Sequence, residues 1–383
     1  MQTVIRKVML SVFTVLFVLL TMITTTFAWI GILTYSSVES FDINIKGENK
    51  LKNDYFITIS STGEKDTFSD SINLMDIQKQ ILINRYDNLN YIDFDSATSE
   101  EINKFFQSKA QLSVTTTYIE QNKLAGFYEL DYSKGPISFI PSKGYYKFDV
   151  YLTVDSREGI SENTRINSNI FITELEDMLT GTPGSGNFID GNPFKDMPSN
   201  PLYDTLKNIP NTFTVNSANA ARVALEIYDP INIDSKYDET HTPTQTIIYQ
   251  GGKNLPYHDD TTGIYDLGGN LPEDYNTAIQ EIIKIRDGYD NMVTPIEILN
   301  RGDLEISKEN SRLWSAPKTI EGTNYLGVQK ILDNGVEKAI QTKMKITVYF
   351  WFEGYDADCL ANIDKKPVKL NLTFTADMDE LNS

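Results

Sequence analysis

Cysteine and histidine are scarce in this 383-residue chain, and their scarcity excludes several kinds of chemistry. Cys359 is the single cysteine, so no disulfide can form within the chain. The two histidines, His241 and His258, are too few for a three-imidazole metal site. A cysteine nucleophile would need one of them nearby, but both lie in segments rich in Thr, Pro, Asp and Gly, so we expect Cys359 to be buried and inert.

The short motifs of well-known enzyme chemistries are missing as well. The sequence has no G-x-S-x-G elbow, no C-x-x-C pair and no H-E-x-x-H helix, and the Gly-Gly-Lys at 251–253 lacks the upstream glycine of a P-loop. A glycosidase-type carboxylate pair is not excluded because acidic residues are abundant, but nothing marks one pair out. We therefore predict a protein that is not an enzyme and that has no cofactor.

Basic residues are few compared with acidic ones. The chain has 34 Lys and Arg against 53 Asp and Glu, which gives a formal net charge of −19. Such a surface repels phosphate backbones and anionic lipid head groups, so nucleic-acid binding is disfavoured. The same surface suits a solvated exterior and attracts divalent cations.

Charge is also missing from the start of the chain. No charged residue occurs at positions 8–38, and Arg6 and Lys7 come directly before this stretch, as in an export signal whose N-terminus stays in the cytoplasm. Thr26 and Ala28 provide the small side chains of a cleavage site after Ala28. Residues 1–28 are therefore a signal peptide or a membrane anchor. Cleavage is the favoured interpretation, and retention as an anchor stays open.

Alternating apolar residues recur along the rest of the chain. The period of two that marks a half-buried strand occurs in six stretches, at 41–45, 55–60, 146–152, 221–227, 344–352 and 370–374. Strands with one apolar face predict antiparallel sheets packed face to face, so the expected fold is a mainly β sandwich or jelly-roll. We treat residues 29–383 as a single elaborated domain.

Helices and long loops are expected as inserts in this domain, near residues 66–122, 180–219 and 229–300. The spacing predicts helices over Ser71–Tyr86, from Thr98 onward, and over Pro272–Gly288. The segment 180–219 and the segment 229–271 are dense in Gly, Pro, Asn and Asp, which is typical of surface loops. The apolar stripes of the helices are expected to pack within the domain.

Two acidic loops are candidates for structural calcium. One contains Asp93, Asp95 and Glu101. The other contains three aspartates, which are Asp229, Asp234 and Asp238. Oxygen-rich loops in an acidic exported protein can bind Ca²⁺, although neither loop has the turn glycine of a helix-loop-helix cage.

The C-terminal segment from Met344 to Ala376 predicts a strand, a tight connection and a returning strand, which together would form a buried hairpin. Gly354 would let the chain leave the first strand, and Asp356 or Asp358 would cap the turn that begins at Cys359. Alternation along the strand predicts that both of its faces are covered, with Trp351 and its neighbour at 349 opposite the phenylalanines at 350 and 352.

Both ends of the chain resemble exported Gram-positive surface proteins. The resemblance rests on Thr25-Thr26-Phe27-Ala28-Trp29 at the start and on Trp351-Phe352-Glu353-Gly354-Tyr355-Asp356-Ala357-Asp358-Cys359 near the end. The start is also similar to that of TasA and camelysin, secreted β-sandwich proteins of the cell surface and biofilm matrix. The strands beginning at Tyr145 and Ala221 are similar to internal strands of the same group.

The resemblance implies a structural role, and in the fibre-forming members an N-terminal strand completes the sheet of the next subunit. Here the donor strand would carry Phe41, Ile43 and Ile45. We therefore expect an exported cell-surface or matrix protein, structural or adhesive, whose partners are further copies of itself or other surface proteins, in addition to the membrane contacted by its N-terminal segment. Two alternatives stay open. One is a membrane-anchored envelope or virion component, and the other is a secreted carbohydrate-binding or carbohydrate-active protein with aromatic side chains such as Trp314 at its surface.

Overall fold

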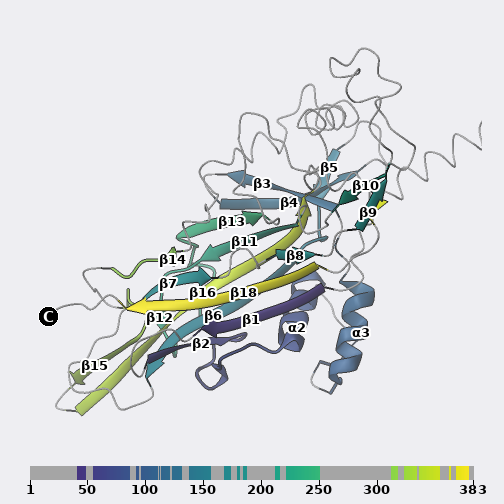
Figure 1. Cartoon of the computed structure of the whole chain (residues 1–383). Coiled ribbons are helices and arrows are strands. Elements are labelled where there is room, and N and C mark those ends of the chain that lie inside the picture. Colours follow the sequence, from purple (N-terminus) through teal and green to yellow (C-terminus); the bar gives the residue numbers. More distant parts are fainter. Residues whose placement is uncertain are drawn as a thin grey trace, which may run out of the picture.

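The structure, a computed structural model, is mainly β, with two α-helices and one 3-10 turn over the residues that it describes (Figure 1). These residues are 41–48, 55–86, 92–94, 96–110, 112, 114–120, 123–131, 138–156, 168–173, 179–181, 184–187, 212–215, 221–250, 312–317, 323–333, 336–353, 362–363 and 368–378. The predicted helix at Pro272–Gly288 and the predicted signal or anchor at residues 1–28 lie outside them.

Eighteen strands are described. They are β1 (Phe41–Glu48), β2 (Tyr55–Ser60), β3 (Val114–Glu120), β4 (Lys123–Asp131), β5 (Ser138–Pro141), β6 (Tyr146–Ser156), β7 (Ser168–Thr173), β8 (Leu179–Gly181), β9 (Gly184–Asn187), β10 (Thr212–Val215), β11 (Ala221–Ile227), β12 (Ile231–Asn232), β13 (Gln245–Gln250), β14 (Arg312–Trp314), β15 (Val328–Asp333), β16 (Val336–Glu353), β17 (Asn362–Ile363) and β18 (Val368–Met378). All six stretches that alternate in the sequence are strands, so the prediction of a mainly β fold is confirmed.

The smaller of the two main sheets contains the first and the last of these strands. Its order is β1-β18-β7-β14, and β8 pairs with the start of β18. β18 is antiparallel to β7 but parallel to β1. The expectation of purely antiparallel sheets is therefore wrong for β1, because this strand adds to the edge of the sheet in the direction of its neighbour.

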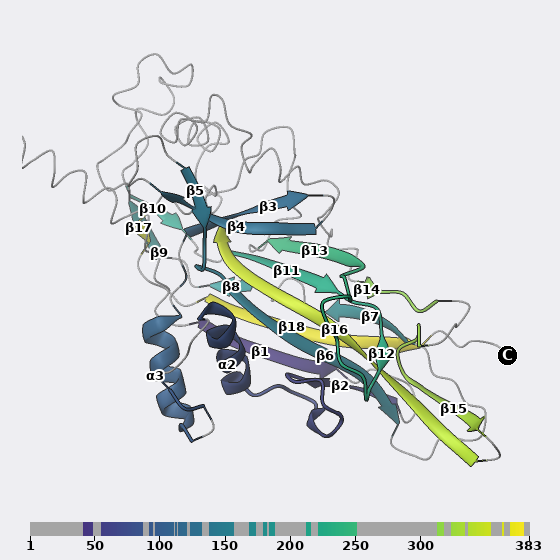
Figure 2. The ribbon, with the colours of Figure 1, turned by 180° about the vertical axis from the view of Figure 1, so that it is seen from behind.

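The larger sheet is built around β16, whose 18 residues make it the longest of the described strands (Figure 2). β11 and β6 flank it on its two sides, and β13 and β2 lie outside these. The end of β16 pairs in parallel with β3, which continues the sheet into β4 and β5. A third, small sheet joins β9, β10 and β17, so the predicted loop at 180–219 contains short strands.

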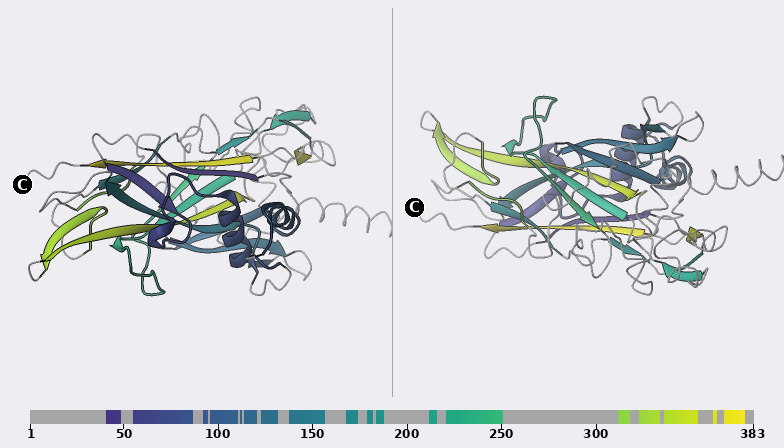
Figure 3. Two further views of the ribbon diagram at one scale, coloured as in Figure 1. Left: turned by 90° about the horizontal axis from the view of Figure 1, so that it is seen from below. Right: turned by 90° about the horizontal axis from the view of Figure 1, so that it is seen from above.

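The hydrophobic core lies between the two main sheets. Seen edge-on in Figure 3, the strands of the smaller sheet form one layer and those of the larger sheet form the other. One cluster of buried residues includes Ile45 of β1 and Leu372 of β18 together with Val150 of β6 and Val348 of β16. Burial of such side chains removes apolar surface from water and is the main force that holds the layers together.

Both described helices match sequence predictions. α2 (Leu74–Arg85) begins after the N-cap Asn73, whose side chain accepts a hydrogen bond from the Met75 amide. α3 (Ser99–Lys109) begins with a capping box, in which Thr98 and Glu101 bond each other's backbone amides. Each helix buries residues four positions apart, as an amphipathic helix does; α2 packs against β6, and α3 packs against α2 (Figures 1 and 2).

α2 also completes an edge of the larger sheet. β2 pairs with β6 only over Tyr151–Ser156, so the edge of β6 before this point needs other partners. Gln80 of α2 supplies them, because its amide accepts from the Asp149 amide N at 2.7 Å and donates to the Asp149 carbonyl at 3.1 Å. Asn84, one turn later, donates to the Lys147 carbonyl at 2.9 Å. Two helical side chains thus bond the backbone of β6 where a strand would otherwise lie.

The predicted C-terminal hairpin is wrong. β16 belongs to the larger sheet and β18 to the smaller one, so the chain changes layers between them instead of turning back on itself. The predicted coverage of both faces of β16 is confirmed. Phe350 and Phe352 lie in the main core, while Tyr349 and Trp351 lie with Phe127 of β4 in a second cluster on the other face.

Candidate functional site

The predicted donor strand is β1, and it lies in the sheet of its own chain. It pairs with β18 over its whole length, from Phe41 beside Val368 to Glu48 beside Thr375. Ile43 and Ile45 are 7% and 1% exposed, which agrees with an apolar face turned into the core. The sequence therefore located this strand and its buried face correctly.

The second edge of β1 is covered over half of its length. The Gly47 amide donates to the Asp70 carbonyl at 3.0 Å, and the Ile72 amide donates to the Ile45 carbonyl at 3.3 Å. Backbone groups point alternately to the two sides of a strand, so those of Phe41 and Ile43 face the same way as those of Ile45. Within the described part of the chain, the backbone groups of Phe41 and Ile43 have no partner on this edge.

Gly47 fixes how closely the end of β1 approaches the larger sheet. A Cβ atom at this position would lie 2.9 Å from Cγ2 of Ile57 and 3.0 Å from its carbonyl oxygen. Only glycine allows so close a backbone approach without displacing β2. The end of β1 is therefore held between β18 and β2, whereas its beginning is held mainly by β18.

A second candidate surface lies on the outer face of the larger sheet, away from the core. Four polar residues occupy one row across four adjacent strands, and the register pairs them in the order Thr246, Glu226, Thr347 and Asp149. Thr347 donates to the Asp149 carboxylate at 2.6 Å. We call this row the polar seam. Its two carboxylates lie on either side of one strand, so their Cα atoms are about 10 Å apart.

Burial controls the chemistry of the seam. Glu226 is 7% exposed and accepts a hydrogen bond from the Tyr349 hydroxyl at 3.0 Å. Burial raises the pKa of Glu226, and the hydrogen bond from Tyr349 only partly opposes this effect. The hydroxyl of Thr246 is buried beside Glu226 without a hydrogen-bond partner among the described residues.

Tyrosine rings and lysines border the seam on both sides. Lys147 lies 5.3 Å from the ring centre of Tyr349, and Lys345 lies 3.9 Å from that of Tyr228. Burial lowers the pKa of Lys345. Two lysines thus balance the two carboxylates, and the seam has little net charge despite the acidic chain.

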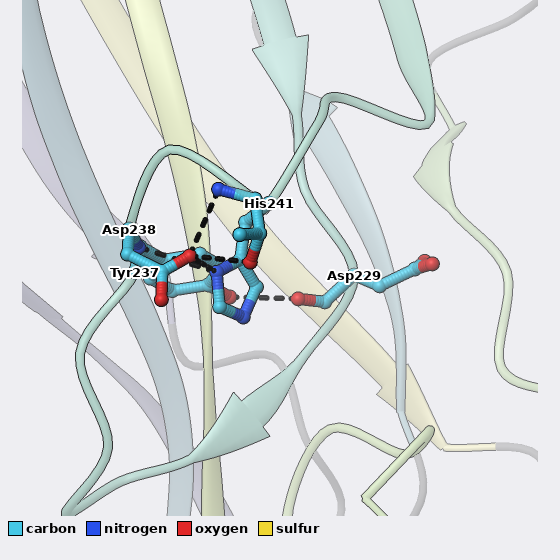
Figure 4. A network of polar contacts seen from close by, with 5 residues as sticks. Asp229, Tyr237, Asp238 and His241 are labelled. Atoms are coloured by element: carbon cyan, nitrogen blue, oxygen red, sulfur yellow. Dashed lines mark hydrogen bonds and ion pairs between the residues drawn. The ribbon is translucent and has the colours of Figure 1, made fainter.

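The loop between β12 and β13 closes one end of this outer face (Figure 4). The Tyr237 hydroxyl donates to the Asp229 carbonyl at 2.7 Å and accepts from the Lys345 amide at 3.1 Å, which fastens the loop to β16. In the same loop the Asp238 carboxylate lies 2.8 Å from Nδ1 of His241 and accepts from Thr240. These hydrogen bonds lower the pKa of Asp238 to about 2.

Asp93 and Glu101, two of the calcium candidates, form hydrogen bonds with residues close to them in sequence. Asp93 accepts from the Ser96 hydroxyl, and Glu101 belongs to the capping box of α3, whose hydrogen bonds lower the pKa of Glu101. A surface hollow of about 560 Å³ lies beside both residues. Asp95 lies outside the described residues. Within the described ranges no cluster of three or more metal-ligating side chains occurs, and calcium binding stays a prediction.

Other predicted site residues are only partly described. Thr26 and Ala28, the processing residues, lie outside the described part of the chain, as do Gly354, Asp356, Asp358 and Cys359 of the C-terminal motif. Trp351 is fully buried, and Glu353 is the last residue of β16. Trp314 is partly buried against the core, so the structure does not present it as an open aromatic platform. No helix among the described residues is long and apolar enough to cross a bilayer.

Sequence reasoning missed the polar seam and the role of Gln80. Alternation in the sequence correctly predicted the strands that contain Asp149 and Glu226. That these two residues share one row depends on the register of three strands, which alternation does not give. Comparison of the chain with protein-family models, curated proteins and solved structures found no match. The resemblance to exported Gram-positive surface proteins of the TasA and camelysin type therefore stays a prediction.

Proposed function

We propose that this protein is an exported structural or adhesive component of a cell surface or extracellular matrix, and that it assembles by exchange of β1 between copies. The observation that carries the proposal is the position of β1. It is an edge strand in a parallel ladder, and the first half of its outer edge has no partner in the described part of the chain. As an edge strand, β1 can leave the sheet without separating two other strands from each other.

Exchange would place β1 of one copy against β18 of the next copy in the register seen within one chain. The buried face with Ile43 and Ile45 would then fill the neighbour's core, and the backbone bonds would be conserved. If each copy donates β1 to the next copy and receives β1 from the previous one, the contact is head-to-tail and its repetition gives a filament. This role needs neither a catalytic residue nor a cofactor.

A pair of cysteines tests the proposal. Asn44 and Asn371 are partners in the β1–β18 register, at a spacing that suits a disulfide. In a Cys359→Ser background, Asn44→Cys with Asn371→Cys should give disulfide-linked multimers on a non-reducing gel when the protein is oxidised after assembly. Oxidation of dilute monomers before assembly should lock β1 in its own chain and leave particles that form no filaments in electron micrographs.

A matched control places the cysteines out of register, as Asn44→Cys with Lys369→Cys, and should give neither product in quantity. If the in-register protein yields only intramolecular disulfides under every assembly condition, or if the locked monomers still form filaments, strand exchange is refuted.

Three more detailed predictions from the sequence are part of this proposal. They are a sandwich with jelly-roll connectivity, an N-terminal export signal or anchor, and self-association as the main partnership. The carbohydrate alternative would use the polar seam, because it combines two carboxylates with tyrosine rings on one face.

A further inference from the structure

The first and the last strands of the described chain lie side by side and run in the same direction. β1 and β18 are paired at eight successive positions. β1 begins beside the beginning of β18, at Phe41 and Val368, and the chain leaves β18 at the opposite end, after Met378. Tension applied between the chain before Phe41 and the chain after Met378 therefore pulls β1 backward and β18 forward.

We propose that the β1–β18 ladder is a mechanical clamp that resists tension applied between the ends of the chain. The two pulling directions are opposite and run along the strands, at right angles to the hydrogen bonds between them. All eight positions must then slip together before the ladder fails. A hairpin pulled at its open end behaves differently, because its bonds break one pair at a time.

Packing beneath the ladder opposes the same slip. Ile43 and Ile45 of β1 and Leu370 and Leu372 of β18 are all buried in the core. A shift of one residue would turn the apolar set of β1 to the solvent face, so the first step of the slip is opposed by the core. The close fit of Gly47 against β2 holds the end of β1 from its other side.

This inference does not depend on strand exchange. In an isolated chain the clamp protects the fold of one molecule, and between exchanged copies the same register would hold neighbours together. A protein that forms no filaments can therefore still show the clamp, and filaments can form without it.

Single-molecule force spectroscopy tests the clamp on the 383-residue chain, kept in detergent because residues 8–38 form a long uncharged stretch. With handles at residues 1 and 383 the ladder is loaded along the strands. With handles at Glu48 and residue 383 the force separates the adjacent ends of β1 and β18, and the ladder is peeled. We expect a several-fold higher unfolding force in the first geometry. Equal forces in the two geometries would overturn the proposal.

A proline variant adds a second readout. The backbone of Asn44 faces β18, because the backbone groups of Ile45 face the segment at 70–72. Asn44→Pro removes a donor from the ladder and should lower the unfolding force under end-to-end tension. The amide of Phe41 faces the other edge of β1, so Phe41→Pro should keep most of the unfolding force. Loss of force in both variants, or in neither, contradicts the clamp. If Asn44→Pro does not fold, the comparison of the two handle positions still tests the clamp.

Discussion

At the scale of single residues, Glu226 shows how a sheet can bury an ionisable group. Its carboxyl lies on a central strand under lysines and tyrosines, with one hydrogen bond from Tyr349. Burial raises its pKa above the ordinary value of 4.5, so the folded protein keeps a proton that the unfolded chain has already lost. The free energy of unfolding therefore falls as the pH rises from about 4.5 through the raised pKa.

Replacing this carboxyl by an amide should stabilise the protein at neutral pH. In Glu226→Gln the side-chain oxygen can still accept from Tyr349, and the new N–H group can donate to the unpartnered Thr246 hydroxyl. We expect the free energy of unfolding at pH 7 to rise by about 1 kcal/mol, the typical net contribution of one buried hydrogen bond. Urea denaturation between pH 4.5 and pH 7 measures it.

The control for this variant is Glu239→Gln in the loop between β12 and β13, where the glutamate is exposed. It should change neither the stability at pH 7 nor its dependence on pH. A Glu226→Gln protein that is less stable than the parent at pH 7, or whose stability changes with pH as the parent's does, would show that the buried carboxylate is fully compensated by its neighbours.

At the scale of elements, α2 acts partly as a replacement for a strand. Gln80 bonds both the amide and the carbonyl of Asp149, the two backbone groups that a neighbouring strand would bond. It also donates to the Ser61 carbonyl at 2.7 Å, which ties the end of β2 to the helix. The helix thus protects an edge of β6 that would otherwise be open to another chain.

Gln80→Glu should break this protection. A carboxylate can accept from the Asp149 amide but cannot donate to the Asp149 and Ser61 carbonyls, and it would face two oxygens. We expect a loss of about 1–3 kcal/mol in the free energy of unfolding at pH 7, measured in urea, because buried acceptors lose their donors. Gln107→Glu, at an exposed position of α3, should be nearly neutral. Equal effects of the two changes would mean that Gln80 has no special role.

At the scale of the whole molecule, local patterns in the sequence predicted the elements better than their partners. Period-two alternation located β1, β6 and β16, and the signature at Thr98 located the start of α3, because these signals act between residues close in sequence. The assignment of β16 and β18 to different sheets could not be predicted in this way. It depends on which apolar faces meet in the core, and that is settled between distant parts of the chain.

The same distinction between local patterns and long-range packing applies to the candidate sites. Alternation at Phe41, Ile43 and Ile45 predicts the apolar face of β1, and the structure buries Ile43 and Ile45 as expected. The polar seam and the bonds of Gln80 arise only after strands and a helix have been placed together, so neither has a signature in a single stretch of sequence.

The pairing of β1 with β18 also sets the order in which the molecule can be completed. Val368 is made 327 residues after Phe41 (368 − 41), so β1 must wait for β18, and closing so large a loop is slow. In refolding experiments with pulsed hydrogen exchange, we expect the amides of β1 to become protected after those of β6 and β16. Simultaneous protection would argue against this order. A newly made chain would then hold β1 unpaired for a time, within reach of a molecule that has already folded.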